Sequence, residues 1–383
     1  MVTATQSFPL LAVPFFIFAG NLMNSTGITD RLINFARLLT GWLAGGLGQV
    51  SIALSLMMGG ISGSAVADAS MEARLLGPSM IEKGGYSKAA TAAVLAFGSI
   101  ITATIPPSIG LILFGFINEV SIGRLFLAGI VPGILLTLTL MVTAWIVARK
   151  NGYAPDLATP ADLVPALGRF PGKCLGACLS GHPDRGLPVR LFHPRPRHGA
   201  FLVFYALFVG FFVYRELSFA KLYEATKGTV ADLGMVMLLI MMAAVLGYAV
   251  TIERGPQQIA ELVTTLTSEP IAILILVLLL LLVSGMFLEG AANILLVTPI
   301  VLPVLVQAGY NPVHMGILIV TLINIGGLTP PVGVIMFTVC GILKVKTGEF
   351  SKASVPYFAA LLVFLALLVA FPALSLFLPG QLM

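Results

Sequence analysis

The stretch GGLTPPVG, from Gly326 to Gly333, decides the fold because it lies inside a long apolar run. Two adjacent prolines interrupt a helix, and glycines loosen it. Lipid cannot satisfy the backbone groups that such a break frees, so a break at membrane depth persists only where protein or a water-filled cavity surrounds it. The stretch therefore predicts a broken helix buried inside a membrane protein, at a place suited to binding an ion.

Composition places the chain among membrane proteins. Of its 383 residues, 58% are hydrophobic and 10% are charged, and the mean hydropathy is +1.03. A soluble domain carries about 25% charged residues. The formal net charge of +5 is spread over the loops, so it fits membrane orientation better than nucleic-acid binding. We therefore expect the lipid bilayer as a partner and no nucleic acid.

Apolar segments recur along the whole chain, and roughly ten to twelve of them are candidate membrane spans. Several are shorter than the about 20 residues that a helix needs to cross a bilayer. Short, interrupted segments of this kind are typical of the broken helices of transporters. The expected segments are Phe8–Met23, Leu43–Met58, Ala89–Thr104, Ile109–Ile117, Phe126–Val147, Phe201–Tyr214, Leu233–Val250, Ile271–Phe287, Ile294–Val306, Gly316–Ile325, Val334–Leu343 and Tyr357–Leu378.

The Pro-Pro stretch has an earlier counterpart in TATIPPSIG, from Thr102 to Gly110. Its prolines precede the later pair by 224 positions, and two other features repeat at the same offset. One offset shared by three features predicts two structural repeats, and inverted repeats are the common arrangement in transporters. The matched pairs are Pro106-Pro107 with Pro330-Pro331, Gly85-Tyr86 with Gly309-Tyr310, and Pro132 with Pro356.

We place the first repeat in residues 1–150 and the second in residues 201–383, with residues 151–200 between them. Each repeat should also carry an amphipathic helix that lies along the interface or braces the bundle, because apolar residues recur there at helical spacing. The two amphipathic stretches are Gly27–Gly41 and Gly255–Thr267.

GGISGSAVADAS, from Gly59 to Ser70, is the densest polar patch of the first repeat. A hard cation such as Na⁺ prefers oxygen ligands. Ser62 and Ser64 offer hydroxyl oxygens, and the glycines expose carbonyl oxygens. Asp68 is a carboxylate at membrane depth, which is a functional candidate by default. The alternative is that the small residues only allow close helix packing.

The two Pro-Pro breaks are the other expected part of the site. Freed amides and carbonyls at a break, together with half-helix ends, can bind an ion or an anion. Thr104 and Thr329 lie close before the prolines, and Ser108 lies just after the first pair. The alternative is a plain proline kink, which membrane helices tolerate.

SGMFLEGAANILLVTPIVLP, from Ser284 to Pro303, is the expected counterpart of the polar patch in the second repeat. Glu289 and Asn293 there are candidates for binding substrate, and capping of a broken helix is an equal alternative. Across both repeats, the substrate-binding candidates are Ser64, Asp68, Ser108, Glu289 and Asn293.

Gly60-Ile61-Ser62-Gly63 also matches the GxSG stretch of intramembrane serine proteases. That chemistry needs a histidine base facing the serine. Outside residues 172–199 the only histidine in the sequence is His314, close to Pro312 at an expected loop. The sequence has neither a P-loop nor an HExxH motif. We therefore expect no enzyme, with an intramembrane protease as a remote alternative.

Five stretches, in this order, make the sequence similar to the large membrane (DctM-like) subunit of tripartite ATP-independent periplasmic (TRAP) transporters. The resemblance covers most of Ser7–Met383. It implies an all-α polytopic protein of the bacterial inner membrane, with a scaffold and a mobile elevator domain that carries two re-entrant helical hairpins. The stretches are SFPLLAVPFFIFAGNLMNSTGITDRLINFARLLTG, GGISGSAVADAS, IPPSIG, EGAANILLVTPIVLPV and GGLTPPVG.

The resemblance also implies a function. Such a subunit couples uptake of an organic acid, often a C4-dicarboxylate or sugar acid, to Na⁺. It works with a small membrane subunit and a periplasmic solute-binding protein. A stand-alone symporter with similar hairpins is the alternative. The family's Na⁺ sites lie around the two hairpin tips, which here match Gly60, Ser62, Gly63 and Ser64, and Gly326, Gly327, Thr329 and Pro330.

Two features depart from the family pattern. The family has a further hydrophobic segment before SFPLLAVPFF, so we expect the chain to be truncated at its N-terminus. Residues 172–199 hold three of the four histidines and four arginines, where the family has an apolar helix ending in GG-x-x-x-G-x-F-T-P-T-E-A. Codons allowed for Gly181–Arg195 approach that motif when moved by one base. We therefore expect a frameshift that enters near Pro171–Leu179 and is restored by about Phe201. A metal site of Cys174, Cys178 and His182 is disfavoured by its spacing.

Overall fold

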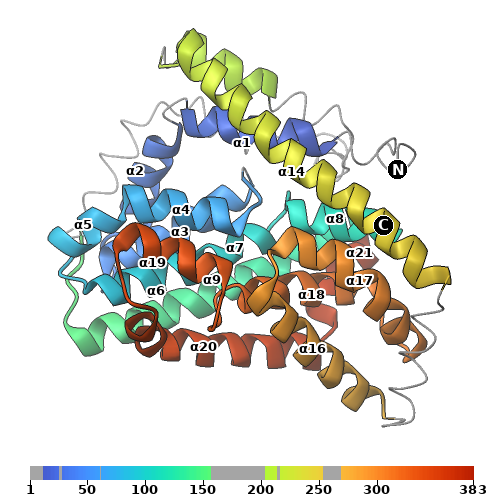
Figure 1. Ribbon diagram of the computed structural model, residues 1–383. Coiled ribbons are helices and arrows are strands. Elements are labelled where there is room, and N and C mark those ends of the chain that lie inside the picture. Colours follow the sequence, from blue (N-terminus) through green and yellow to red (C-terminus); the bar gives the residue numbers. More distant parts are fainter. Residues whose placement is uncertain (1–11, 26–27, 61, 157–202, 214–215, 253–268) are drawn as a thin grey trace.

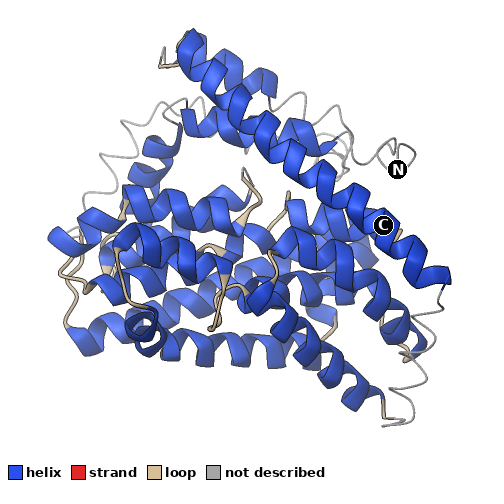
Figure 2. Cartoon of the chain, viewed as in Figure 1, coloured by secondary structure: helices blue, strands red, loops and turns tan. Residues whose placement is uncertain are grey.

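The computed structural model describes residues 12–25, 28–60, 62–156, 203–213, 216–252 and 269–383. Within these ranges the regular secondary structure is helical, and Figure 2 shows no strand among them. The chain is therefore an all-α protein, as the sequence predicts.

The first half contains nine helices in the described ranges. Turns that contain proline, glycine or serine separate successive helices, because such residues end one helix or cap the next. The helices are α1 (Ala12–Ser25), α2 (Ile28–Thr40), α3 (Gly46–Gly59), α4 (Ala65–Leu75), α5 (Gly77–Glu82), α6 (Lys88–Gly98), α7 (Ile100–Thr104), α8 (Ile109–Ile117) and α9 (Ile122–Asn151).

The second half begins, in the described part, with residues 203–213, which end in the π-helix η4 (Val209–Val213). A helix of 34 residues follows, and then three pairs of helices. These are α14 (Phe219–Ile252), α16 (Pro270–Phe287), α17 (Gly290–Gln307), α18 (Pro312–Gly326), α19 (Val334–Leu343), α20 (Thr347–Ala370) and α21 (Ala373–Leu382).

Most expected apolar segments are helices, and two of them need correction. The expected span Tyr357–Leu378 is two helices, because α20 ends at Ala370 and Pro372 caps the start of α21. The expected span Ala89–Thr104 is divided at Ser99 into α6 and α7. The amphipathic stretch Gly27–Gly41 forms α2, and its expected counterpart at residues 255–267 lies outside the described residues.

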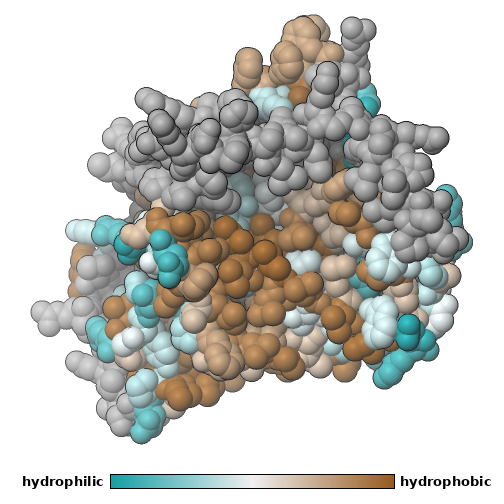
Figure 3. All heavy atoms as spheres, turned by 180° about the vertical axis from the view of Figure 1, so that it is seen from behind, coloured by the Kyte–Doolittle hydropathy of each residue, from teal (hydrophilic) through white to brown (hydrophobic). Residues whose placement is uncertain are grey.

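In the described part of the chain, five helices are long and apolar enough to cross a membrane, and a sixth span results if α6–α7 and α8 count as one broken helix. The two parts of that pair meet at an angle of 46°. From behind, Figure 3 shows a broad apolar surface with hydrophilic residues gathered toward its left and right edges. The five helices are α9, the part of α14 from Phe219 to Met242, α16, α17 and α20.

A small apolar cluster accompanies the main core. It joins α1, residues 203–213 and α14, and its buried centre consists of Leu22, Ala206, Leu217 and Ala225. Asn21 on α1 also donates from Nδ2 to Thr229 Oγ1 on α14 at 3.1 Å. In Figure 1, α1 and α14 lie along the upper side of the molecule, and α14 also packs against α17. These elements thus form a layer with contacts of its own.

Helix boundaries recur along the chain at nearly one spacing. Helices α3 and α16 begin 224 positions apart, as do α6 and α18, whereas α4 and α17, α8 and α19, and α9 and α20 begin 225 positions apart. The packing is also reciprocal: α4 packs against α19 while α17 packs against α8, and α6 packs against α20 while α18 packs against α9.

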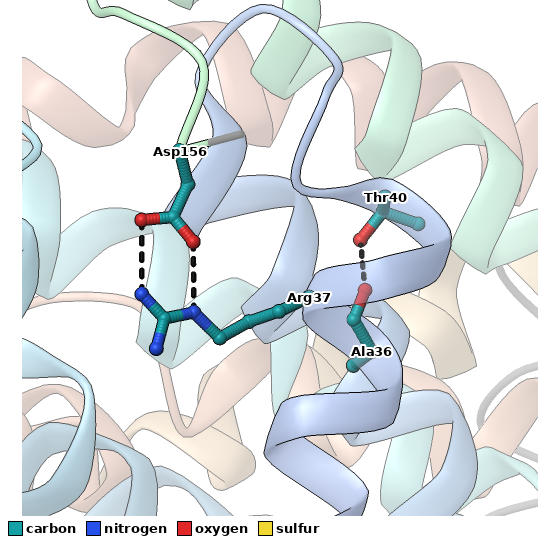
Figure 4. A network of polar contacts seen from close by, with 4 residues as sticks. All are labelled: Ala36, Arg37, Thr40 and Asp156. Atoms are coloured by element: carbon teal, nitrogen blue, oxygen red, sulfur yellow. Dashed lines mark hydrogen bonds and ion pairs between the residues drawn. The ribbon is translucent and has the colours of Figure 1, made fainter. Parts of the chain in front are cut away.

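An ion pair fastens α2 to the segment that follows α9 (Figure 4). Arg37 binds both carboxylate oxygens of Asp156, with Nε–Oδ2 at 2.7 Å and Nη2–Oδ1 at 3.0 Å. This hydrogen bond raises the pKa of Arg37. The backbone amide of Asp156 also donates to the carbonyl of Gly41 at 2.8 Å. The amphipathic helix is therefore held at its C-terminal end.

We predict that Asp156→Asn lowers the melting temperature of the purified protein by about 2 °C, because a partly exposed ion pair contributes about 0.5–1 kcal/mol. Arg37→Gln should lower it by a similar amount, and the double variant by no more than the larger single change. Fully additive losses in this cycle would contradict the ion pair. The exposed carboxyl of Glu82 provides the control, Glu82→Gln, which should leave the melting temperature unchanged.

Candidate ion and substrate site

The first Pro-Pro break separates α7 from α8. Helix α7 ends at Thr104, and α8 begins at Ile109. The Ser108 hydroxyl donates to the carbonyl of Ala103 at 2.6 Å, and it accepts from the amide of Leu111 at 3.4 Å. Ser108 therefore closes the break and caps α8 at once. The Pro106-Pro107 bond is cis.

The polar loop between α3 and α4 packs against this break. Gly63 has φ +61°, and a Cβ placed on it would lie 2.6 Å from the carbonyl oxygen of Pro107. Its own carbonyl accepts from the amide of Ile109 at 3.3 Å. The buried Ser62 hydroxyl has no hydrogen-bond partner among the described residues. Ser64 caps α4, with its side chain accepting from Ala67. The Gly59–Ser70 and Thr102–Gly110 stretches are thus brought together.

The second Pro-Pro break separates α18 from α19 and is cis at Pro330-Pro331. Its loop is fixed to the end of α16, because the Gly333 amide donates to the carbonyl of Met286 at 2.8 Å. The Thr329 hydroxyl donates back to the carbonyl of Ile325 at 2.8 Å. This break therefore packs against the other expected polar patch, as the first break does.

Two backbone carbonyl oxygens of the second loop lie close to Gly333. The carbonyl oxygens of Gly327 and Thr329 each lie 2.9 Å from the point where a Cβ on Gly333 would stand, so the position suits a residue without a side chain. Gly333 has φ +46°, a region that glycine adopts readily. The Gly327 carbonyl also accepts from the amides of Ile335 at 3.0 Å and Met336 at 3.2 Å, at the start of α19.

The polar residues of α16 and α17 lie beside this loop. The Glu289 carboxylate accepts from the amides of Ala291 at 2.9 Å and Ala292 at 3.3 Å, so Glu289 is the N-cap of α17. Asn293 is fully buried, and its Oδ1 accepts from the Ser284 hydroxyl at 3.1 Å. Asn293 Nδ2 has no partner in the described part of the chain. The capping alternative is therefore confirmed for Glu289, and Asn293 keeps a donor for a ligand.

The two halves of the site meet through α7, α8 and α18. The hydroxyls of Thr104 and Thr321 lie 3.4 Å apart. Gly110, just after the first break, lies against α17 and α18, because a Cβ on it would stand 3.1 Å from Val320 and 3.2 Å from Ile294. Ile294 adjoins Asn293. In the described residues no hydrogen bond joins Asp68 to Glu289 or Asn293, and the observed link between the halves runs through these helices.

A buried polar cluster lies behind the first loop. Asp68 is 1% exposed, and its Oδ2 accepts from the Thr102 hydroxyl at 2.7 Å. Its Oδ1 has no partner among the described residues. Glu72, one turn later on α4, is 0% exposed and accepts from Ser55 at 2.9 Å and from Ser51. Sequence reasoning missed Glu72, although the four-residue spacing from Asp68 places both carboxyls on one helix face.

The geometry does not support protease chemistry. The Nδ1 atom of His314 lies 2.6 Å from the Ser375 hydroxyl, on α18 and α21. Ser62 lies at the α3–α4 loop against the first break, and its hydroxyl has no histidine partner among the described residues. A nucleophilic serine needs that base within hydrogen-bond reach.

The first break packs against the α3–α4 loop and the second against the end of α16, and each half holds a buried polar atom without a partner among the described residues, on Ser62 and on Asn293. Broken helices are a place where membrane transporters bind ions and polar ligands. The family model described as the tripartite ATP-independent periplasmic transporter, DctM component, matches residues 1–374.

The chain belongs to the DctM family. The family match covers every motif discussed above, and DctM members are transport permeases, so the expectation that the chain is not an enzyme is confirmed. The expected frameshift within residues 172–199 lies outside the described residues and stays a prediction.

Relatives in the family are named for different transported compounds. The chain is 36% identical to the sialic acid TRAP transporter large permease protein SiaM of Vibrio cholerae, over 99% of this chain and 88% of SiaM. It is 34% identical to the 2,3-diketo-L-gulonate TRAP transporter large permease protein YiaN of Escherichia coli, over 97% of this chain and 86% of YiaN. It is 35% identical to the isethionate TRAP transporter permease protein DctMQ of Oleidesulfovibrio alaskensis, over 99% of this chain but 59% of DctMQ.

Proposed function

We propose that this DctM protein is the permease subunit of a Na⁺-coupled, binding-protein-dependent importer of organic acids. The observation that carries the proposal is the pair of helix breaks, of which the first packs against the glycine-rich α3–α4 loop and the second against the C-terminal end of α16. Broken helices at membrane depth are where secondary transporters bind substrate and coupling ions.

Two inverted repeats, near residues 1–150 and 201–383, account for the recurring helix boundaries and for the reciprocal packing. The α3–α4 pair is then the first re-entrant hairpin, and the α16–α17 pair is the second. Inverted repeats let one body present similar sites to both membrane faces. The layer of α1 and α14 supplies the scaffold of an elevator mechanism, and the body with both hairpins supplies the moving part.

Na⁺ is the proposed coupling ion because the loops offer oxygen atoms and no soft ligands. In the first loop the ligands would come from Gly60, Ser62, Gly63 and Ser64, and in the second from Gly326, Gly327, Thr329 and Pro330. The Ser62 hydroxyl, which has no partner among the described residues, and the Thr329 carbonyl beside Gly333 fit such an ion. The buried charge of Asp68 favours a cation in the first loop.

An organic acid is the proposed substrate, of the C4-dicarboxylate or sugar-acid type, because relatives are named for sialic acid, diketogulonate and C4-dicarboxylate. Ser108 and the free amide of Asn293 would contact it between the breaks, together with Ser64. The tripartite family description favours two partners, a small membrane subunit and a periplasmic solute-binding protein. The location proposed is the bacterial inner membrane.

Basic residues favour one membrane orientation. The loop after α5, the end of α9 and the α19–α20 loop lie at one end of the bundle, the left in Figure 1, because Tyr153 stacks on Tyr86 at 4.0 Å and Leu343 contacts Gly77. Cytoplasmic loops are enriched in lysine and arginine. Loops 118–121 and 308–311 at the other end hold none. The basic residues at the first end are Lys83, Lys88, Arg149, Lys150, Lys344 and Lys346.

We therefore predict that a cysteine replacing Lys346 faces the cytoplasm and one replacing Gln307 faces the periplasm. Both positions are exposed. In a variant lacking the three native cysteines, a membrane-impermeant maleimide should label Gln307→Cys in intact spheroplasts, and Lys346→Cys only in inverted vesicles. The opposite pattern would reverse the orientation.

Uptake by proteoliposomes tests the tripartite function. The chain is reconstituted with its small subunit, and uptake of a radiolabelled organic acid is measured with and without the purified solute-binding protein. Uptake should occur only with the binding protein. Equal uptake without it would favour the alternative, a stand-alone symporter.

A further inference from the structure

Glu72 is a second carboxyl in the first hairpin, and it has no counterpart in the second. Helices α4 and α17 begin 225 positions apart, which pairs Asp68 with Asn293 and Glu72 with Val297. Asp68 and Asn293 are both buried side chains with one unpartnered polar atom. Glu72 is therefore an additional titratable group in the first of the two matched helix pairs. It lies near Asp68, which is a carboxyl where the second pair has the neutral Asn293.

The surroundings of Glu72 supply hydroxyls but no positive charge. The Ser55 hydroxyl donates to Glu72 Oε1 at 2.9 Å, and the Ser51 hydroxyl lies 2.5 Å from Oε2. The Thr102 hydroxyl donates to the Asp68 carboxylate and also lies 3.0 Å from the carbonyl oxygen of Ser55. In the described residues the ion pairs are Arg31–Glu216 and Arg37–Asp156, and neither reaches this cluster.

The helices that pack against α4 bring no counter-charge either. These are α3, α5, α6, α7 and α19, and α3 and α7 contain no titratable residue. Lys88 on α6, Glu82 on α5 and Arg74 on α4 itself are exposed at the end of the bundle. Cys340 on α19 is a buried, neutral thiol. Among the described residues, the buried carboxyl on the same face of α4 as Glu72 is that of Asp68.

Two ionised carboxylates one turn apart, both removed from water, are costly without a cation. A proton on Glu72 removes one charge and leaves a satisfied group, since the carboxyl can donate to Ser51 and accept from Ser55. Asp68 then remains as the single negative charge, with Oδ1 free of protein partners in the described chain.

We infer that Glu72 holds a proton that leaves when Na⁺ enters the neighbouring loop of the first hairpin, so that H⁺ and Na⁺ compete for the charge of the Asp68–Glu72 pair. In this step Na⁺ enters, the O–H bond of Glu72 breaks, the electron pair stays on the carboxylate and the proton passes to water. The net charge of the region is unchanged. The inference rests on the proposed Na⁺ coupling.

Linkage fixes the direction of the effect. If Na⁺ binding lowers the proton affinity of Glu72, then protonation of Glu72 lowers the affinity for Na⁺ by the same factor. The Na⁺ concentration for half-maximal uptake should therefore fall as the pH rises, by up to about tenfold per pH unit for one linked proton. Glu72→Gln keeps a neutral side chain that can donate and accept, so its half-maximal Na⁺ concentration should not change with pH.

Proton release from the purified protein is the test. NaCl is added to the reconstituted chain in a weakly buffered solution with a pH-sensitive dye, with choline chloride as the salt control. Wild type and the exposed-carboxyl control Glu82→Gln should release up to one proton per chain, and Glu72→Gln should release none. An infrared difference spectrum of wild type should show that Na⁺ removes a protonated-carboxyl band, and this result does not depend on the variant folding.

The possible outcomes distinguish failure of the Glu72 inference from failure of the proposed Na⁺-coupled transport. Na⁺-driven uptake without proton release, or equal release from wild type and Glu72→Gln, would overturn the inference and leave the transport function intact. Wild type that neither binds Na⁺ nor needs it for uptake would overturn the Na⁺ coupling as well.

Discussion

Gly326→Ala should abolish most uptake and destabilise the protein. A Cβ on Gly326 would lie 2.7 Å from the Cα of Gly285 and 2.8 Å from the carbonyl of Leu282, so α16 and α18 must separate at the second break. Overpacking of this kind costs about 1–3 kcal/mol. A displacement near 1 Å in a positioned site costs about 100-fold in rate. We therefore expect uptake to fall by at least about tenfold, together with a lower melting temperature.

The matched control is Gly341→Ala on α19. This glycine is exposed, and a Cβ on it would meet nothing within 4 Å. Alanine also favours a helix over glycine by about 1 kcal/mol. Gly341→Ala should therefore keep full uptake and an equal or higher melting temperature. If the two variants behave alike, the close approach of α16 and α18 does not matter for transport.

Asp68→Asn should reduce Na⁺-dependent uptake by about 10- to 100-fold at a fixed Na⁺ concentration. The substitution keeps the size of the side chain and its hydrogen bond with Thr102, but it removes the buried negative charge nearest the first loop. Coupling energies of about 1–3 kcal/mol correspond to this range. The measurement is the initial rate of uptake as a function of Na⁺ concentration, in which the loss should diminish as Na⁺ is raised.

Glu82→Gln removes a carboxyl that is exposed at the end of α5, so it controls for charge alone. It should leave the Na⁺ curve unchanged. A loss in Asp68→Asn that no Na⁺ concentration relieves would place Asp68 in contact with the substrate instead, as one of the candidates for that role.

The breaks could be predicted from the sequence because paired prolines at membrane depth have few alternatives. Helices α8 and α19, which follow the two breaks, have the predicted bounds Ile109–Ile117 and Val334–Leu343. The bend of α20 into α21 was missed, because a single Pro372 in an apolar run is a weaker signal than a Pro-Pro pair. Local sequence thus predicts helix breaks at Pro-Pro pairs but not at a single proline in an apolar run.

The site was only partly predictable, because its contacts join distant segments. The packing of Gly63 on Pro107, and of Gly333 on Met286, depends on how two helix pairs fold together. Helix α4 was expected as a polar patch, since its Ala, Ser, Asp and Glu content lacks an apolar run. Glu72 was overlooked because its buried position depends on contacts with a distant segment, through Ser51 and Ser55 of α3.

The most direct test of the account is uptake driven by an ion gradient alone. Proteoliposomes with the chain, its small subunit and the loaded solute-binding protein are diluted into buffer that imposes an inward Na⁺ gradient, an inward K⁺ gradient or none. We predict that the organic acid accumulates above its external concentration only with the Na⁺ gradient. Equal accumulation with K⁺, or with no gradient, would contradict the proposal that the loop of the first hairpin and the loop of the second Pro-Pro break couple Na⁺ to transport.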